Sequence, residues 1–416
     1  MVGFEDAQQR TPLPALRLLA LFAAAVTAVS LTACAAAAPT PAASVADSAL
    51  SGRVVEFDAA TLTAVFEQQA EEMMLPGAVM IVRTPDGDLE VPYGVTEWGG
   101  STPVTIDDHV RIGSNTKTWT GTAILQLVEE GAIALEDPVS KYRPDVPNGD
   151  GITIEQLLTM RSGLFNYTAT LELNAAMDET PERVWDPEEL VRMGLAESPS
   201  FEPGKGYAYS NTNTILLGLI AEELEQKPLP EIFQERLFQP LGLIETSMPA
   251  LSDASMPSPY AHGYMFSNNV DTMDGSELSA EDRAAVEAGE MLPTDHAADN
   301  PSWAWAAGSG ISTAPELADW VAALGGGGLL SDGMQQRRIE SVQPSEGEGA
   351  YGWGLAGMGP FYGHIGELPG YNSFMGYDPD TDVTVVVWAT LAPNLEGKPA
   401  AAIIARSLMD AMYGGG

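Results

Sequence analysis

The stretch RIGSNTKT, residues 111–118, holds a serine and a lysine three positions apart, Ser114 and Lys117. A hydroxyl is a poor nucleophile until a neighbouring base takes its proton. Positions i and i+3 of a helix lie on one face, with Cβ atoms about 5 to 6 Å apart, so Lys117 would stand beside Ser114 Oγ. A helix start also offers free backbone N–H groups to a developing oxyanion. The pair therefore predicts an acyl-transfer centre, although a serine cap followed by a lysine is common when it occurs alone.

A second polar element is Tyr209-Ser210-Asn211, which follows the turn at 203–206 and precedes an apolar run. A phenol can relay a proton, and an amide side chain can hold a polar group of a substrate. The structural alternative is a tyrosine packed at a helix entrance, with Asn211 as the cap.

A third element is the segment GHIG, which runs from Gly363 through His364 to Gly366 inside a predicted strand. Glycines in a strand let another backbone approach closely. His364 adds a group that can titrate near neutral pH. Taken alone, His364 could equally be a hydrogen-bonded histidine within a sheet.

The surrounding pattern predicts the elements that must position these residues. Strand patterns occur near both ends of the chain and helix patterns between them, which predicts an α/β (α+β) fold with one antiparallel sheet flanked by helices. The sheet region is expected at about 53–125 and 300–416, and an inserted helix-rich region at about 126–299. The individual expectations are helices over 59–74, 115–130 and 399–413, a hairpin turning at Pro85-Asp86-Gly87, strands over 352–357, 360–365, 371–378 and 383–390, and a long irregular excursion over 251–300.

In this order, the three elements resemble those of the serine β-lactamase and D-alanyl-D-alanine carboxypeptidase-like superfamily, in which S-x-x-K, Y-x-N and a K/H-x-G triplet line one cleft. The tyrosine element is similar to that of the branch with class C β-lactamases, D,D-peptidases and esterases. The resemblance covers roughly residues 55–413. It includes the stretches IEQLLTMRSGL (154–164), FEPGKGYAYSNTNTILLGLIAEEL (201–224), LFQPLGLIETSM (237–248), AAGSGISTAPELADWVAALGGGGLL (306–330) and GHIGELPGYNSFMGYDP (363–379).

The resemblance implies a β-lactamase/transpeptidase-like fold and a catalytic role for several residues. Ser114 would attack a carbonyl and become acylated, while Lys117 and Tyr209 would move the proton; which of the two is the base stays open. Asn211 would orient the substrate amide. Neither a metal nor a cofactor is implied, and no metal-ligand spacing such as H-E-x-x-H occurs in the sequence.

The resemblance also implies that His364, Gly366 and Glu367 form a substrate-binding strand, with the backbone N–H groups of Ser114 and Glu367 as the oxyanion hole. Carboxypeptidase-like members bind a terminal carboxylate through hydroxyl residues at and just after the triplet. Here those positions hold Ile365 and Glu367, and no Lys or Arg occurs between residues 338 and 398. An anionic side chain there should weaken binding of a carboxylate.

The composition limits the partners. The formal net charge of −39 over 416 residues repels polyphosphate, so no nucleic-acid partner is expected. The hydrophobic fraction of 45% is enough for a sizeable core. The expected partner is a small-molecule or peptidoglycan-peptide substrate.

The N-terminal segment resembles an export signal with a lipidation site. An apolar run at 18–31 follows basic residues and is shorter than the ~20 residues of a membrane span. It ends in Leu31-Thr-Ala-Cys34, similar to a bacterial lipobox, and Cys34 is the sole cysteine. We expect a lipoprotein signal peptide at 1–33, an Ala/Pro/Ser-rich tether at 34–52 and a hydrolase domain at 53–416. The protein would be extracytoplasmic, with this lipid anchor as its only membrane contact.

The predicted function is an extracytoplasmic serine hydrolase that forms an acyl-enzyme on Ser114. A D-alanyl-D-alanine carboxypeptidase-like activity ranks first, and a carboxylesterase or β-lactamase of the same fold is the alternative. The non-enzyme alternative is an inactive lipoprotein that binds cell-wall material or another ligand.

Overall fold

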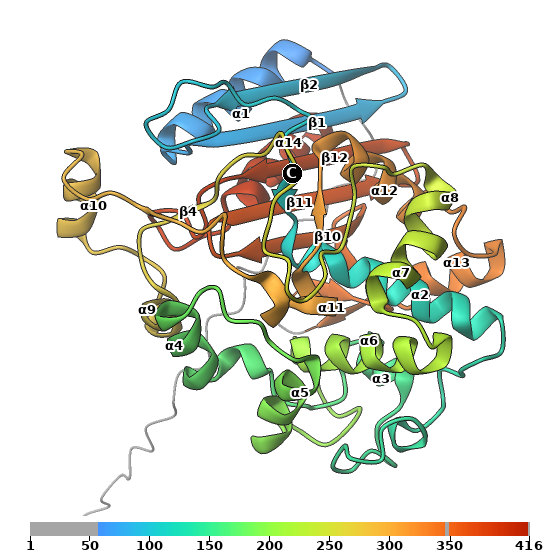
Figure 1. Ribbon diagram of the computed structural model, residues 1–416. Coiled ribbons are helices and arrows are strands. Elements are labelled where there is room, and N and C mark those ends of the chain that lie inside the picture. The colour runs from blue at the N-terminus through green and yellow to red at the C-terminus, as the bar shows by residue number, and fades with distance from the viewer. Residues whose placement is uncertain (1–56, 346–348, 415–416) are drawn as a thin grey trace, which may run out of the picture. The chain divides into compact units, whose positions relative to one another are not determined.

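An antiparallel eight-stranded sheet unites the two ends of the described chain (Figure 1). The computed structural model describes residues 57–345 and 349–414, and all of these described residues belong to one compact unit. The strand order is β2-β1-β12-β11-β10-β9-β8-β7. The strands are β1 (Gly77–Thr84), β2 (Gly87–Gly94), β7 (Gln343–Ser345), β8 (Gly349–Tyr351), β9 (Ala356–Met358), β10 (Phe361–Leu368), β11 (Tyr371–Asp378) and β12 (Val383–Ala389).

Helices cover both faces of this sheet and form most of the region between residues 116 and 241 (Figure 1). They are α1 (Ala59–Glu72), α2 (Thr116–Glu129), α3 (Ile154–Leu158), α4 (Leu171–Glu179), α5 (Pro187–Ala196), α6 (Asn211–Glu225), α7 (Leu229–Phe233), α8 (Gln239–Leu241), α9 (Asn269–Asp274), α10 (Ala280–Glu287), α11 (Trp305–Gly308), α12 (Ala314–Gly326), α13 (Asp332–Glu340) and α14 (Ala400–Tyr413). The predicted fold class, an antiparallel sheet flanked by helices with an inserted helix-rich region, is therefore confirmed.

The central strands are apolar on both sides because two cores lie against the sheet. In β12, Val385 and Val387 join the core that contains α1 and α14. Val386 and Trp388 point the other way, into the larger core that contains α2, α6 and α12. Successive side chains of a strand alternate between faces, so a continuous apolar run is what a strand buried on both sides requires.

Helix α2 runs through the larger core and is buried along almost its whole length. Trp119 packs edge-on against Phe233, Phe238 and Trp320, with ring centroids 5.9, 4.7 and 6.3 Å away. Trp320 also donates from Nε1 to Thr118 Oγ1 over 2.9 Å. Such aromatic pairs add stability beyond the area that they bury. The helix that carries Lys117 is consequently held rigidly from several sides.

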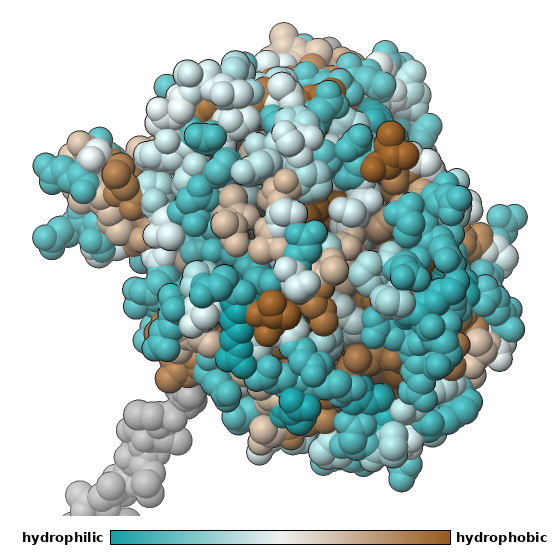
Figure 2. All heavy atoms as spheres, in the orientation of Figure 1, coloured by the Kyte–Doolittle hydropathy of each residue, from teal (hydrophilic) through white to brown (hydrophobic). Residues whose placement is uncertain are grey.

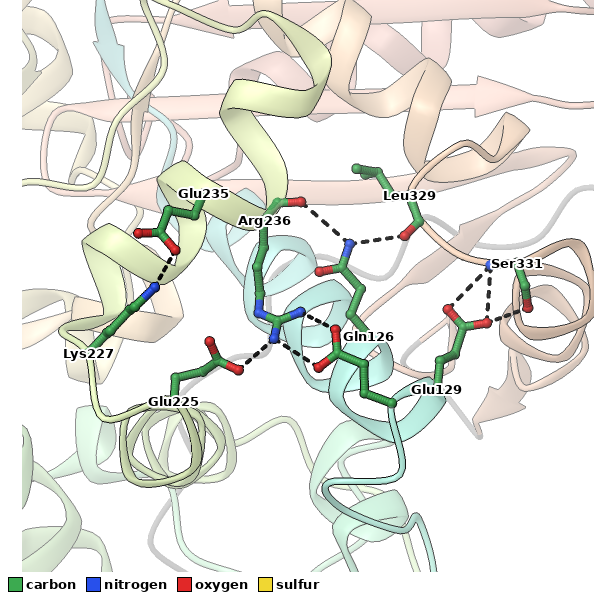
Figure 3. A network of polar contacts seen from close by, with 9 residues as sticks. Gln126, Glu129, Glu225, Lys227, Glu235, Arg236, Leu329 and Ser331 are labelled. Carbon is green, nitrogen blue, oxygen red and sulfur yellow. Dashed lines mark hydrogen bonds and ion pairs between the residues drawn. The ribbon is translucent and has the colours of Figure 1, made fainter.

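The C-terminal end of α2 is fixed by a polar network (Figure 3). Arg236 donates to both carboxylate oxygens of Glu130, over 2.7 and 3.0 Å, and to Glu225 over 2.5 Å. Gln126 donates to the carbonyl of Leu329 over 3.0 Å, and Glu129 accepts from Ser331. Arg236 holds the pKa of Glu130 below its usual range. A bidentate Arg–carboxylate contact has defined geometry, which suits it to fixing the register of neighbouring helices.

The expected irregular excursion over 251–300 is only partly irregular. It contains two short helices, α9 and α10, and the two-residue strands β4 (Tyr264–Met265) and β5 (Thr294–Asp295), which pair with each other. The N-caps explain the helices, because Asn268 and Ser279 each accept from a backbone N–H three residues on. The predicted strand over 352–357 is also wrong in its first part, since β9 begins at Ala356.

Hydrophilic side chains cover most of the face seen in Figure 2. This agrees with the strong negative charge of the sequence. The exposed large apolar side chains among the described residues are scattered: Leu171, Val184, Ile244 and Leu292. None of the helices within the described part of the chain is long and apolar enough to cross a membrane. The predicted signal peptide, tether and Cys34 lie outside the described residues.

Candidate active site

Ser114 sits in a tight turn immediately before α2. The 3₁₀ turn Gly113–Asn115 (η1) follows β3 (Val110–Arg111), which pairs with β6 (Ile311–Ser312). Gly113 has φ of +54°, a conformation that L side chains adopt at a cost. The turn presents Ser114 partly exposed while its neighbours are buried. The predicted helix at 115–130 is observed as α2, Thr116–Glu129, and Ser114 lies in the 3₁₀ turn that leads directly into it.

Lys117 lies beside Ser114, as the spacing predicts. Lys117 Nζ is 2.9 Å from Ser114 Oγ and 2.7 Å from the carbonyl oxygen of Ala307. The side chain is only 1% exposed, and no ion pair joins Lys117 to a described carboxylate. Desolvation without a counter-charge disfavours the ammonium form, so the pKa of Lys117 lies well below its usual value.

Tyr209 completes a contact triangle with these two residues. Its hydroxyl is hydrogen-bonded to the Ser114 side chain, and Lys117 Nζ lies 4.9 Å from the centroid of its ring. The ring contacts Tyr351 and His364, with centroids 6.0 and 6.1 Å away. Desolvation by these surroundings raises the pKa of Tyr209 above its usual value. The tyrosine is therefore a neutral phenol at ordinary pH.

His364 is a buried, neutral imidazole with both nitrogens occupied. Nδ1 lies 2.6 Å from the carbonyl oxygen of Ile365, which can only accept, so Nδ1 carries the proton. Nε2 then accepts from the hydroxyl of Tyr351 over 3.1 Å. Burial, reinforced by the charge of Lys117, lowers the pKa of His364 to about 3. His364 supplies shape and hydrogen bonding near neutral pH, but no positive charge.

Strand β10 packs directly against the turn that holds Ser114. A Cβ atom at Gly113 would collide with the backbone nitrogen of Glu367, and one at Gly366 would collide with the carbonyl oxygen of Ile112. Glycine at both positions permits this approach. The backbone N–H of Glu367 is consequently brought close to the Ser114 turn, where two N–H groups can face one oxyanion.

A cavity of about 240 Å³ opens beside Ser114. Asn211 lies on its wall at the start of α6, where its Nδ2 donates to Thr168 Oγ1 and its backbone N–H donates to Asn166 Oδ1, both over 3.0 Å. The contact with Thr168 orients the side-chain amide of Asn211, and the contact with Asn166 fixes its backbone. The lining residues are Ser114, Tyr167, Thr168, Leu173, Asn174, Met177, Asn211, Met265, Asn269, Thr272, Ser276, Trp303, Ala304, Ala307, Gly308, Glu367, Leu368, Pro369, Ala392 and Pro393.

Glu367 also lines this cavity, and the residue is exposed. Desolvation nevertheless raises the pKa of its carboxyl group to about 7. Its closest hydrogen-bonding contact is a long one, 3.4 Å from Asn372 Nδ2. It forms no ion pair with any residue of the described segments, so its charge is not compensated locally.

The structure sorts the predicted residues into two groups. Lys117 and Tyr209 meet at the Ser114 hydroxyl, and His364 lies against the ring of Tyr209. Ser114, Asn211 and Glu367 line the cavity. Lys117, Tyr209, His364 and Gly366 are not among its lining residues. The substrate-binding role of His364 and Gly366 stays a prediction.

Sequence reasoning missed three groups that shape the centre. The carbonyl of Ala307 accepts from Lys117, the Tyr351 hydroxyl fixes the tautomer of His364, and Thr168 orients Asn211. A backbone carbonyl carries no residue-type signal. Tyr351 and Thr168 lie in stretches without a motif, so nothing local marked them.

Comparisons with known proteins agree with this geometry. The sequence model of the family described as Beta-lactamase matches residues 62–409. The chain is similar to the Putative penicillin-binding protein PbpX of Bacillus subtilis (strain 168), with 25% identity over 78% of this chain and 73% of that protein. It is similar to Esterase EstB of Burkholderia gladioli, with 32% identity over 49% of this chain and 55% of that protein. The crystal structure of a D-stereospecific amidohydrolase from Streptomyces sp. superposes with a TM-score of 0.71 and 28% identity, covering 86% of this chain and 100% of that one.

Proposed function

The chain belongs to the Beta-lactamase family, and we propose that its Ser114 forms an acyl-enzyme with the substrate. The chain is a serine hydrolase of the β-lactamase and penicillin-binding protein group. The proposed substrates are small esters or amides that lack a carboxylate near the scissile bond. The observation that carries this proposal is the cavity beside Ser114. Among its described lining residues there is no Lys, Arg or His, and Glu367 is the one residue with a charged form near neutral pH. A carboxylate is bound strongly by charge-assisted hydrogen bonds, which this lining does not offer.

The proposed mechanism begins with neutral Lys117 as the base. Its lowered pKa leaves the amine free to accept the Ser114 proton, whereas the raised pKa of Tyr209 keeps the phenol protonated. Ser114 Oγ then bonds to the substrate carbonyl carbon, and the N–H groups of Ser114 and Glu367 stabilise the oxyanion.

Collapse of the tetrahedral intermediate breaks the bond to the leaving group. The proton from Lys117 passes to the leaving group through the Tyr209 hydroxyl, which is hydrogen-bonded to Ser114. Water then attacks the acyl-enzyme and gives one proton to the same pair. The bond between the acyl carbon and Ser114 Oγ breaks, the pair returns the proton to Ser114 Oγ, and the acid is released. Asn211 holds the polar part of the acyl group throughout.

A peptide ending in D-Ala-D-Ala is expected to react more slowly than the same peptide with its C-terminal carboxylate converted to an amide. At pH 8 Glu367, with a pKa of about 7, is mostly ionised and repels the free carboxylate. We expect kcat/KM to favour the amidated peptide by about 10-fold, a size typical of one like-charge contact. Parallel initial rates, with a short-chain nitrophenyl ester as reference, measure this ratio.

The control is Glu367→Thr, which removes the repulsion and adds a hydroxyl. This variant should reduce the difference in kcat/KM between the free peptide and the amidated peptide. A wild-type enzyme that clearly prefers the free carboxylate would refute the proposed substrate class.

That outcome would support the second candidate, a D-alanyl-D-alanine carboxypeptidase. Similarity to a penicillin-binding protein favours it. The two arginines just before the sheet do not supply the missing charge, because Arg338 is buried against Thr122 of α2 and Arg337 stacks on Trp353. A dedicated β-lactamase ranks third, and turnover of a chromogenic cephalosporin tests it.

We further propose that the protein is an extracytoplasmic lipoprotein, anchored through Cys34. The proposal rests on the apolar run at 18–31 followed by Leu-Thr-Ala-Cys. Cys34→Ala is expected to shift the protein from the membrane fraction to the soluble fraction, or to leave an unprocessed precursor. Fractionation and intact-mass analysis distinguish these outcomes. A Cys34→Ala variant that is processed and retained like the wild type would rule out lipidation at this residue.

A further inference from the structure

Glu367 combines three properties that call for a partner from outside the protein. It is an exposed residue that lines the cavity beside Ser114. It makes no ion pair with any described residue, and its only amide contact is the 3.4 Å one from Asn372. Asn372 is already committed, because its Nδ2 donates to Gly366 O over 3.0 Å and its Oδ1 accepts from Ala401 N over 2.7 Å. A partly desolvated carboxylate without a counter-charge destabilises the protein that carries it.

The position of Glu367 along the strand links this charge to the reacting bond. The packing of β10 on the Ser114 turn brings the backbone nitrogen of Glu367 close to Gly113, next to the proposed oxyanion hole. The carboxylate is attached to the same residue, a few bonds away. A cation that reached it would therefore have to sit close to the scissile carbonyl. An ammonium group on the carbon next to that carbonyl meets this requirement.

The remainder of the cavity suits a small acyl group. Its volume of about 240 Å³ lies below the ~300–1,000 Å³ typical of sites for drug-sized ligands. The walls combine apolar side chains, such as Leu173, Met177 and Leu368, with the amides of Asn174 and Asn211. These groups can hold one small side chain and its amide, and none of them competes with Glu367 for a cation. The net charge of −39 also attracts cations toward the surface.

We propose that Glu367 is a specificity-determining residue that selects amides or esters carrying a protonated amine beside the scissile carbonyl, that is, α-aminoacyl substrates with a free amino group. The Glu367 carboxylate accepts charge-assisted hydrogen bonds from this ammonium while Ser114 attacks the adjacent carbonyl. The inference rests on the proposed acyl-enzyme function and narrows its substrate class. No covalent step beyond that function is added.

A matched substrate pair tests the proposal. Alanine p-nitroanilide and isobutyryl p-nitroanilide have the same size, and differ in that the first has an ammonium group where the second has a methyl group. At pH 7.5 the amine is still mostly protonated, because α-amino groups have pKa values of about 7.7 to 8.0. We expect the wild-type enzyme to prefer one enantiomer of the alanine substrate over isobutyryl p-nitroanilide by at least about 10-fold in kcat/KM.

Glu367→Gln keeps the size of the side chain and removes its charge. This variant should bring the ratio of the two kcat/KM values close to one. Glu290→Gln is the matched control, because Glu290 is exposed in the loop after α10 and is not among the cavity-lining residues. It should keep the wild-type ratio. A preference that survives in Glu367→Gln, or a wild-type ratio of one or less, overturns the inference.

Hydrolysis of p-nitrophenyl acetate separates this inference from the proposed function. If the wild-type enzyme hydrolyses this neutral ester but does not prefer the ammonium substrate, the inference fails and the proposed function stands. If it turns over none of the substrates, the proposed function fails. Calorimetry with alanine amide and isobutyramide then decides the binding role of Glu367 separately. If the wild-type protein binds alanine amide more tightly than isobutyramide and Glu367→Gln does not, the binding role of Glu367 is supported. If the wild-type protein binds both amides equally, this role is refuted.

Discussion

Ser114→Ala is expected to abolish covalent labelling by a fluorophosphonate and to lower kcat/KM for ester hydrolysis by about 10⁴-fold or more, a loss typical of removing the nucleophile of a serine hydrolase. The physical reason is that no other hydroxyl in the described segments has the same surroundings. Ser114 Oγ lies 2.9 Å from the Lys117 amine and at the edge of the cavity. The variant should lose catalytic rate and keep its stability, because Ser114 is partly exposed and loss of its hydroxyl leaves the packing of α2 unchanged.

Intact-mass and peptide-level spectra after slow acylation place the adduct. We expect it on the peptide that contains Ser114. Ser309→Ala is a matched control, because Ser309 lies next to the cavity residue Gly308 and its buried Oγ has no hydrogen-bond partner among the described residues. This variant should label like the wild type. An adduct on Ser309 or Ser210 would contradict the assignment. The absence of any adduct in a folded wild-type protein would favour the inactive binding lipoprotein instead.

Local geometry explains why the centre of the site could be predicted from the sequence. The contact between Ser114 and Lys117 depends on one helical turn, whose spacing is the same in every protein. The hairpin of β1 and β2 follows from an apolar run beside a Pro-Asp-Gly turn, and both strands are observed. The sheet built from both ends of the chain follows from where strand patterns occur along the sequence.

Contacts between distant segments explain what could not be predicted. Ala307 reaches Lys117 because β6 pairs with β3 across about two hundred positions, and its carbonyl has no sequence signature. Tyr351 meets His364 because β8, β9 and β10 are neighbours in the sheet. The charge state of His364 could not be predicted from the sequence either, because burial rather than residue type lowers its pKa to about 3. The sequence suggested a group that could become cationic, and the structure shows a neutral hydrogen-bonded ring.

Lys117→Met and Tyr209→Phe are each expected to lower kcat/KM by about 10³-fold, and the double variant should lose little more than either single one. General acid–base groups usually contribute about 10²- to 10⁴-fold. Lys117 and Tyr209 act on one proton path, so their effects should not multiply. Both substitutions conserve shape: methionine fits the buried channel of the lysine side chain, and phenylalanine keeps the ring contacts with Tyr351 and His364.

The pH profile separates the role of the base from that of the relay. Desolvation lowers the pKa of Lys117, so the active neutral amine forms as pH rises through this lowered value and is lost below it. The wild-type enzyme should therefore lose kcat/KM on the acid side of its profile. Tyr209→Phe should retain that acid limb at a lower overall rate, because its lysine still titrates. Lys117→Met should lose the limb, because the titrating group is gone. If the acid limb persists in Lys117→Met but disappears in Tyr209→Phe, the assignment is reversed and a tyrosinate is the base. That outcome would require surroundings that favour the ionised phenol, whereas burial stabilises the neutral phenol of Tyr209.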